Sequence, residues 1–276
     1  MFVIVNGDDF GLTRGINLGI ARAFDRGVLT SASLVAQGRA FGHAVELARD
    51  RPGLDLGVHL VLTDEAPLLT DAPLVRGVPP GAPLPGRNAL FAALLAGRVD
   101  LRAVRAEWRA QVSRVLDAGL SPTHLDGHQF VHLFPGLFPI CLALAQEFSI
   151  PHVRRAVADP FSRGTGLARL AQLAALRSFI RVLVPADPRA VPCVGFSRAG
   201  GRMAPRDLEA LLSGLSGRPV VEIMLHPGLP DAETLALYSS WGYAWENDVE
   251  LAASPETRRI LAAAGRRLAG FSEVRT

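Results

Sequence analysis

Short apolar segments with a β-sheet composition alternate with longer segments of helical periodicity along most of this chain. Strands are predicted at residues 2–6, 31–35, 54–62, 123–126, 152–154 and 220–225, with a weaker one near 270–274. Several of the helix-like segments between them end in glycine, as helices often do. This alternation predicts parallel βα units.

Two architectures, a doubly wound open sheet and a closed barrel, fit the alternation, and the polar side chains separate them. Six polar residues lie in the C-terminal half of a predicted strand or just beyond it: Asp8, Asp9, His59, Asp126, His128 and His226. A barrel brings the C-terminal ends of its strands to one face, whereas an open sheet spreads them along an edge. We therefore predict an α/β fold, an irregular TIM-barrel-like (β/α) barrel forming a single domain over residues 1–276.

A Pro/Gly-rich insertion without periodicity, LLTDAPLVRGVPPGAPLPGR, occupies residues 68–87. Loops of this length in compact enzymes often act as lids or substrate walls, and a solvated excursion fits the composition equally well. The stretch near residues 158–218 carries no motif that assigns it a role.

Composition and charge argue against several functional classes. The 276 residues are 49% hydrophobic and carry a formal net charge of +3, with arginine as the only basic residue apart from histidine. The arginines are scattered, which argues against nucleic-acid binding. No apolar run is long enough to span a membrane, and because the sequence enters a predicted strand at residue 2 we expect no secretory leader. Cys141 and Cys193 lie in apolar surroundings, so we expect no disulfide framework and a cytoplasmic setting.

The segment VNGDDFGL, residues 5–12, places Asp8 and Asp9 side by side at the end of the first predicted strand. Adjacent carboxylates repel each other, and a simple turn needs only one of them. The pair is therefore either a costly turn or part of a site.

The segment HLDGHQFVH places His124, His128 and His132 four residues apart. On a helix this spacing would put the three on one face, but Gly127 interrupts the run. We read residues 123–126 as a strand end in which His124 and Asp126 share one side. Residues 128–133 then form the loop that leaves this strand, and His128, beyond the glycine, is free to turn into the barrel mouth. A structural role for the histidines remains an alternative.

Two further histidines belong to strands. His59, in LGVHLVLT, lies in an otherwise apolar strand, where a lone histidine is more often a core residue than a ligand. His226, in VEIMLHPG, ends a strand just before a Pro-Gly turn. It can act as a general acid or base, or it can simply bond the backbone of the turn.

One carboxylate and two imidazoles form a suitable face for a divalent metal ion, with positions left open for water and substrate. If one member of the Asp8–Asp9 pair joins His59 and His128 on such an ion, the cation offsets the repulsion within the pair. The other aspartate then stands where a base is needed.

These motifs resemble those of the YdjC-like (ChbG-type) carbohydrate deacetylases, also called chitooligosaccharide deacetylases. The resemblance rests on four segments in order: VNGDDFGLTRGINLGIARAFDRGVLTSASLV, LGVHLVLT, PTHLDGHQFVHLFPGLFP and EIMLHPG. It implies a TIM-barrel-like fold and metal-dependent hydrolysis that removes an N-acetyl group from an amino sugar. It also suggests a possible homodimer.

The resemblance implies roles for individual residues. Asp9, His59 and His128 would bind one divalent ion, most often Mg or Zn, while Asp8 would be the general base and His226 the general acid.

Four further residues are expected to contact substrate or to orient other site residues: Asp126, His124, His132 and Arg154. Phe130 stands where the family commonly has another histidine, which puts substrate contacts in doubt rather than the metal.

The residues themselves leave other functions open. A metal-dependent hydrolase of a phosphoester or of another amide fits the same face, and Arg154 with Arg155 would then clamp the phosphate. A non-catalytic sugar-binding barrel needs no base beside the metal, so the Asp8–Asp9 pair argues against it. A glycosidase is disfavoured, because adjacent carboxylates do not straddle a sugar bond. Trp241, Tyr243 and Trp245 offer surfaces for sugar stacking or simply pack the end of the barrel.

Overall fold

The computed structural model describes residues 1–157, 190–196, 201–213, 215, 217–263 and 265–274, together with residues 171, 174 and 178. The described strands are β1 (Phe2–Phe10), β2 (Ser31–Leu34), β3 (Asp55–Leu60), β4 (His124–Gly127), β5 (His152–Val157), β6 (Ala190–Val194), β7 (Val220–Leu225) and β8 (Arg267–Leu268). The described α-helices are α1 (Arg14–Arg26), α2 (Phe41–Arg49), α3 (Arg87–Leu95), α4 (Leu101–Asp117), α5 (Leu137–Glu147), α7 (Pro205–Ser213), α8 (Ala232–Tyr238), α9 (Trp245–Ala253) and α10 (Pro255–Ala262). Three 3-10 segments complete them: η1 (His128–Leu133), η3 (Ser239–Trp241) and η4 (Phe271–Glu273).

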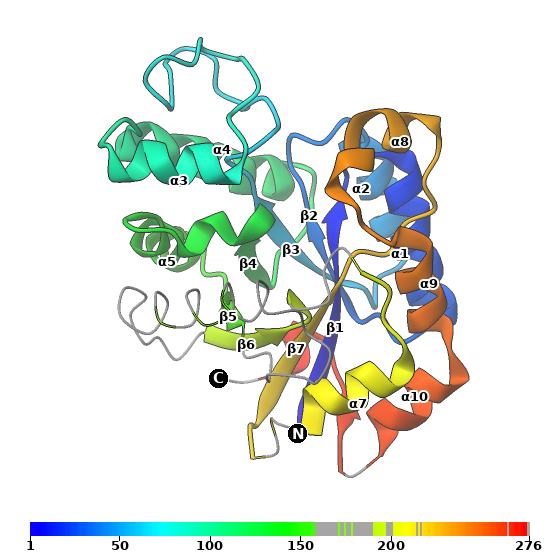
Figure 1. Cartoon of the computed structure of the whole chain (residues 1–276). Coiled ribbons are helices and arrows are strands. Elements are labelled where there is room, and N and C mark those ends of the chain that lie inside the picture. The colour runs from blue at the N-terminus through cyan, green and yellow to red at the C-terminus, as the bar shows by residue number, and fades with distance from the viewer. Residues whose placement is uncertain are drawn as a thin grey trace.

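Strands β1 to β7 form a closed parallel barrel, which confirms the predicted fold class. Each strand pairs with the next in chain order, and β1 closes the ring by pairing with both β2 and β7. The short β8 joins the start of β1 alongside this ring. Figure 1 shows helices α1, α2, α8 and α9 on one side of the strands and α3, α4 and α5 on the other. The C-terminal strand ends therefore meet at one mouth, as in other α/β barrels.

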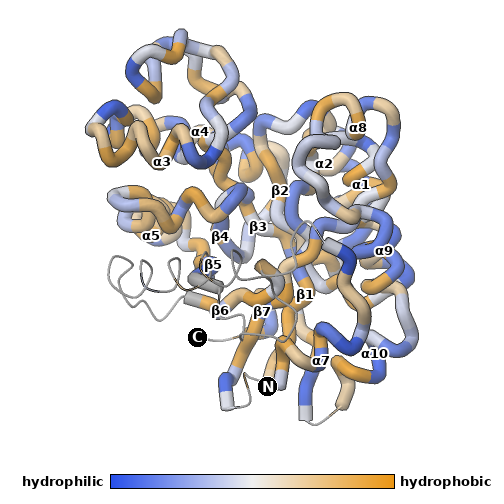
Figure 2. Tube along the Cα trace, in the orientation of Figure 1, coloured by the Kyte–Doolittle hydropathy of each residue, from blue (hydrophilic) through white to orange (hydrophobic). Residues whose placement is uncertain are grey.

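The hydrophobic core lies within the barrel wall and between the strands and the helices. Eight of the nine residues of β1 are buried, and α1 turns Ile16, Ile20 and Ala23 inward at helical spacing. The side chain of Thr13 caps α1 by accepting a hydrogen bond from the Ile16 N–H. Figure 2 shows the resulting contrast between hydrophobic β6 and the more hydrophilic outer helix α9.

The observed secondary structure differs from the predicted one at three places. The weak strand near residues 270–274 is wrong, because this segment forms the 3-10 turn η4 and the strand β8 precedes it. Strand β6, with Pro192 in its middle, was not predicted. Residues 128–133, predicted as a loop, form the kinked segment η1, in which Gln129 and Phe130 have left-handed φ values of 52° and 59°.

Val75 of the 68–87 insertion forms an isolated antiparallel bridge with Val99, which follows α3, and the insertion otherwise has no strand or helix before α3. Its start is anchored to α4, because the buried Glu107 carboxylate accepts hydrogen bonds from the N–H groups of Leu68 and Leu69 at 2.9 Å each. Most of residues 158–200, where no motif is predicted, lie outside the described residues. Within the described chain, none of the helices combines the length and the hydropathy needed to cross a membrane.

Substitution of Gly19 tests the close contact between α1 and the loop after β7. A Cβ atom at Gly19 would lie 2.2 Å from the Gly228 Cα, whereas a Cβ atom at Gly42 on α2 meets nothing within 4 Å. We expect Gly19→Ala to lower the free energy of unfolding by about 3 kcal/mol through overpacking. Gly42→Ala is the control and should raise it by about 0.5 kcal/mol through helix propensity. Urea denaturation measures both, and an unchanged stability of Gly19→Ala would contradict the contact.

Candidate metal centre and surrounding pocket

The end of β1 presents two adjacent carboxylates to the same site. Asp8 and Asp9 are both buried, although neighbouring residues of a regular strand point to opposite faces. The register between β1 and β2 shifts between Gly7 and Phe10, and Asp9 has a left-handed φ of 71°. This irregularity turns both carboxylates toward the barrel interior, as bulges do elsewhere.

Asp9, His59 and His128 converge from β1, β3 and the residue that follows β4. The Asp9 Oδ1 atom lies 2.9 Å from His128 Nδ1 and 3.5 Å from His59 Nε2. One ligand atom from each of the three residues lies within 4.8 Å of the others. Although burial opposes the negative charge, His128 and His59 hold the pKa of Asp9 well below its usual range.

Two buried polar atoms of this cluster have no hydrogen-bond partner among the described residues and could bind a metal ion. These are the Asp9 Oδ2 and His128 Nε2 atoms. Buried polar atoms normally have partners, and a cation would satisfy both of these. A carboxylate with two imidazoles is a common donor set for divalent ions, so the residues present fit such an ion.

Asp126 orients His59 from behind. The His59 Nδ1–H group donates to Asp126 Oδ1 at 2.8 Å, which leaves Nε2 directed at Asp9. Although burial opposes the positive charge, Asp126 and Asp8 raise the pKa of His59 to about 10. A carboxylate in this position fixes the tautomer and ring orientation of a metal-binding histidine. The predicted orienting role of Asp126 therefore has a geometric basis.

Arg154 lies at the centre of a second charged cluster. Its fully buried guanidinium binds both oxygens of Asp8 at 2.7 Å and also contacts Asp126 and Glu222. These carboxylates raise the pKa of Arg154 well above its usual value, although burial opposes the charge. Burial raises the pKa of Glu222 to about 7, although Arg154 opposes this shift. Because all of these groups are buried, Arg154 is a structural partner of Asp8.

A chain of hydrogen bonds through Asn6 and Ser33 connects the Arg154 cluster with Asp126, the partner of His59. The Asn6 side-chain amide donates to Asp8 Oδ1 and to Ser33 Oγ, both at 2.8 Å. The Ser33 hydroxyl donates in turn to Asp126 at 2.7 Å and lies 3.2 Å from His124 Nε2. The His124 ring fits only because Gly57 has no side chain, since a Cβ atom there would lie 2.2 Å from His124 Nε2.

His124 and His132 lie outside the pocket. His132 Nε2–H donates to the backbone carbonyl of Arg154 at 2.9 Å, and the ring packs against Gly127. Burial lowers the pKa of His124 to about 3 and that of His132 to about 4. Both histidines are therefore neutral supports of β4 and β5 and do not contact a molecule in the pocket.

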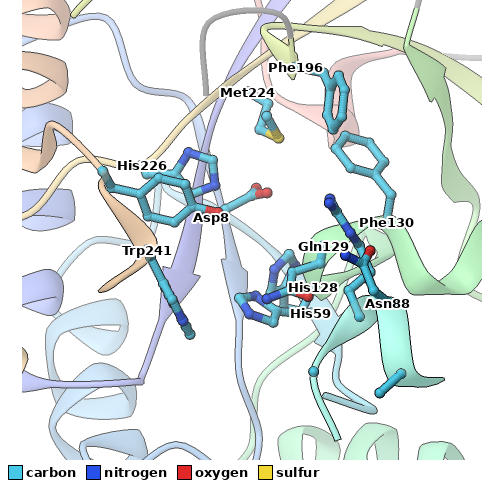
Figure 3. A pocket seen from close by; sticks show the side chains of 15 residues that line it. Asp8, His59, Asn88, His128, Gln129, Phe130, Phe196, Met224, His226 and Trp241 are labelled. Carbon is cyan, nitrogen blue, oxygen red and sulfur yellow. The ribbon is translucent and has the colours of Figure 1, made fainter. Parts of the chain in front are cut away.

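A cavity of about 440 Å³ opens beside these clusters at the barrel mouth. Figure 3 shows Asp8, His59 and His128 directed into it, with His226 and Trp241 toward one side and Phe130 and Phe196 toward the other. Residues 86–89, at the junction of the Pro/Gly-rich insertion and α3, also line it. The insertion therefore contributes to the wall of the pocket, whereas Trp245 is buried and contacts Gly228.

Aromatic rings cover two of the histidines. The ring of Tyr243 stacks on His226 with centroids 4.1 Å apart, and Trp241 lies over His128 at 4.9 Å. The backbone N–H of His226 donates to the buried Asp248 carboxylate at 2.8 Å, which fixes the turn after β7. His226 thus lies at the pocket wall, as its position at a strand end predicts.

The structure brings together Asp8, Asp9, His59, His128 and His226, which the sequence singled out. Several residues of the site carried no recognised signal: Asn6, Ser33, Glu222, Asn88, Gln129, Phe196 and Met224. Of these residues, Glu222 could have been found from the sequence, because a carboxylate inside an apolar strand indicates a buried charge partner.

The fold and the site together define an α/β-barrel protein with a candidate metal centre at the barrel mouth. The family model for YdjC-like proteins matches residues 2–263. The chain belongs to this YdjC-like family.

Two carbohydrate deacetylases and one solved structure are similar to the chain over half of its length or more. A carbohydrate deacetylase from Brevibacillus brevis is 34% identical over 99% of this chain and 100% of the relative. A carbohydrate deacetylase from Geobacillus stearothermophilus is 40% identical over 54% of this chain and 58% of the relative. Among solved structures, a "putative cellobiose-phosphate cleavage protein" from Enterococcus faecalis superposes with a TM-score of 0.75 at 26% identity, over 99% of this chain and 98% of that one.

The buried neutral state of His124 predicts a defined pH dependence of stability. The pKa of His124 in the folded protein, about 3, lies below its value in the unfolded chain. Acidification toward pH 5 therefore protonates His124 in the unfolded chain but not in the folded protein. The free energy of unfolding of the metal-free wild type should therefore fall between pH 7 and pH 5 by about 2 kcal/mol more than that of His124→Asn. Urea titrations in EDTA measure this difference. Equal pH dependence in the two proteins would show that His124 takes up a proton in the folded state.

Proposed function

We propose that this protein is a metal-dependent hydrolase that removes an N-acetyl group from an amino sugar or an acetylated oligosaccharide. The observation that carries the proposal is the juxtaposition of the Asp9–His59–His128 cluster with Asp8 and His226, which both line the same cavity. The names of the two carbohydrate deacetylases described above support the same reaction class.

Asp9, His59 and His128 would hold one divalent ion, with Mg or Zn as the first candidates. The ion, when bound, supplies a Lewis acid for the acetyl carbonyl and lowers the pKa of a water molecule. His59 offers Nε2 because Asp126 holds Nδ1, and His128 offers the nitrogen that has no other partner among the described residues.

Asp8 would act as the general base. Its carboxylate lines the cavity, and its orientation is fixed by two hydrogen bonds from Arg154 and one from Asn6. A base held in this way takes the proton of the attacking water without first having to reorient.

His226 would act as the general acid that protonates the departing amine. It lies in the cavity wall with Tyr243 stacked on one face of its ring, so the ring is restrained while its edge stays available. An amine is a poor leaving group without this proton, and imidazole is the side chain best suited to deliver it near neutral pH.

The cavity suits a sugar ring. Trp241 and Tyr243 offer aromatic faces on which the apolar face of a pyranose can stack, and Asn88 and Gln129 offer amides for its hydroxyls. The phosphatase alternative used Arg154 together with Arg155 as a phosphate clamp, and the position of Arg154 argues against such a clamp. That guanidinium is fully buried on three carboxylates, so it does not serve a substrate phosphate.

The reaction is tested by acetate release from di-N-acetylchitobiose and a panel of N-acetyl sugars, with added Zn, Mg or Co and with EDTA. We expect metal-dependent release that falls by about 10²- to 10⁴-fold in Asp8→Asn, because the general base is lost. Asp117→Asn, an exposed change at the end of α4, is the matched control and should keep full activity. Full activity of Asp8→Asn would remove Asp8 from the mechanism, and release that survives EDTA without metal would overturn the metal dependence.

The metal assignment is tested separately by metal content. His128→Ala should lower the affinity for Zn by at least about 100-fold, since removal of a ligand costs more than the 10- to 100-fold loss typical of changes to residues that only orient the ligands. His43→Ala, a change to a histidine of α2 that bonds Asn17, should leave the affinity unchanged. Equal Zn affinity of His128→Ala and wild type, measured by competition with a chelator, would show that the ion is bound elsewhere.

A further inference from the structure

One nitrogen atom of Arg154 lies among three carboxylates from three different strands. The Nη2 atom is 2.7 Å from an Asp8 oxygen, 2.7 Å from an Asp126 oxygen and 2.5 Å from a Glu222 oxygen. All four side chains are buried, with Arg154, Asp126 and Glu222 at 0% exposure. A guanidinium nitrogen carries only two hydrogens, so the third oxygen is held by charge.

Three carboxylate oxygens around one point are the surroundings that a hard divalent cation prefers. Asp8, His59 and Asp126 also offer ligand atoms that lie within 4.8 Å of one another. This second group shares His59 with the Asp9–His59–His128 cluster. Both carboxylates of this second group, Asp8 and Asp126, are partners of Arg154, so the guanidinium lies where a second cation would bind.

We propose that the Arg154 guanidinium takes the place of the second cation, so that this centre binds one divalent ion and a variant without the guanidinium binds two. The position of the first ion, at Asp9, His59 and His128, rests on the proposed function.

The charges explain why this position requires a cation. Asp8, Asp126 and Glu222 are buried together, and a buried charge without a compensating partner strongly destabilises the folded protein. Arginine stays protonated at every accessible pH and, being covalently attached, does not dissociate. Its place in the strand is fixed, because His132 donates a hydrogen bond to its backbone carbonyl.

The arrangement also has a chemical consequence. A metal ion bound to Asp8 would occupy lone pairs of the carboxylate, whereas hydrogen bonds from Arg154 and Asn6 leave others of its roughly four acceptor positions open to a water molecule. By holding Asp8 away from a second ion, Arg154 keeps it available as a base. Arg154 is thus a positioning residue that also determines the number of ions.

The test is equilibrium dialysis of the full-length protein against Mn²⁺, with three matched proteins. Wild type should bind one ion per chain, Arg154→Lys should also bind one because it keeps the charge, and Arg154→Ala should bind two. The double variant Arg154→Ala/Glu222→Gln should bind the second ion at least about 10-fold more weakly, because it loses one carboxylate of the new site. Two ions on wild type, or one ion on a folded Arg154→Ala, would overturn the inference.

A second measurement keeps the inference testable if Arg154→Ala does not fold. The electron paramagnetic resonance spectrum of Mn²⁺-saturated wild type should be that of an isolated Mn²⁺ ion, because the guanidinium excludes a neighbouring one. An exchange-coupled spectrum would overturn the inference and leave the metal-dependent hydrolase standing. Wild type that binds no Mn²⁺ and no Zn would overturn both.

Discussion

The buried ion pairs of Arg154 are the interaction on which the rest of the site depends. One guanidinium, from β5, neutralises carboxylates delivered by β1, β4 and β7. Replacing a buried ion pair with apolar groups is often harmless to stability, so stability alone does not explain why these charges persist. They are better explained by the site, because the guanidinium orients Asp8 beside the candidate metal ligands, where the proposed mechanism needs a base.

A second constraint is the irregular end of β1. If this strand kept its regular pleat, Asp8 and Asp9 would point to opposite faces, and only one of them would reach the barrel interior. The left-handed conformation of Asp9 allows the two to divide the work between ligand and base in the proposed mechanism. Left-handed backbone at a residue other than glycine costs free energy, and such strain concentrates at functional sites. The same holds for Gln129 and Phe130, which directly follow the candidate ligand His128.

The barrel was predictable from the sequence because apolar strands alternate with amphipathic helices and because polar residues repeatedly follow the strands. The strand at residues 220–225 was predicted with its observed ends. Strand β6 was not, because Pro192 lacks an N–H group and reads as a strand breaker. The short helices α8 to α10 were not predicted either.

The gathering of the site residues was predictable in part. The convergence of Asp9, His59 and His128 follows from strand ends that meet at one mouth. The pairing of Arg154 with Asp8, Asp126 and Glu222 does not, because it depends on which residues of β5 and β7 point inward and how far their side chains reach. His124 and His132 share the spacing of His128 but support the strands instead, since Gly57 and Gly127 leave room for their rings beneath the pocket.

The most direct test of this account is an anomalous diffraction map from a crystal of the wild-type protein grown with Mn²⁺. The account predicts a single peak within bonding distance of Asp9, His59 and His128, with the Arg154 guanidinium still in contact with Asp8, Asp126 and Glu222. A peak among those three carboxylates, with Arg154 displaced from them, would contradict it.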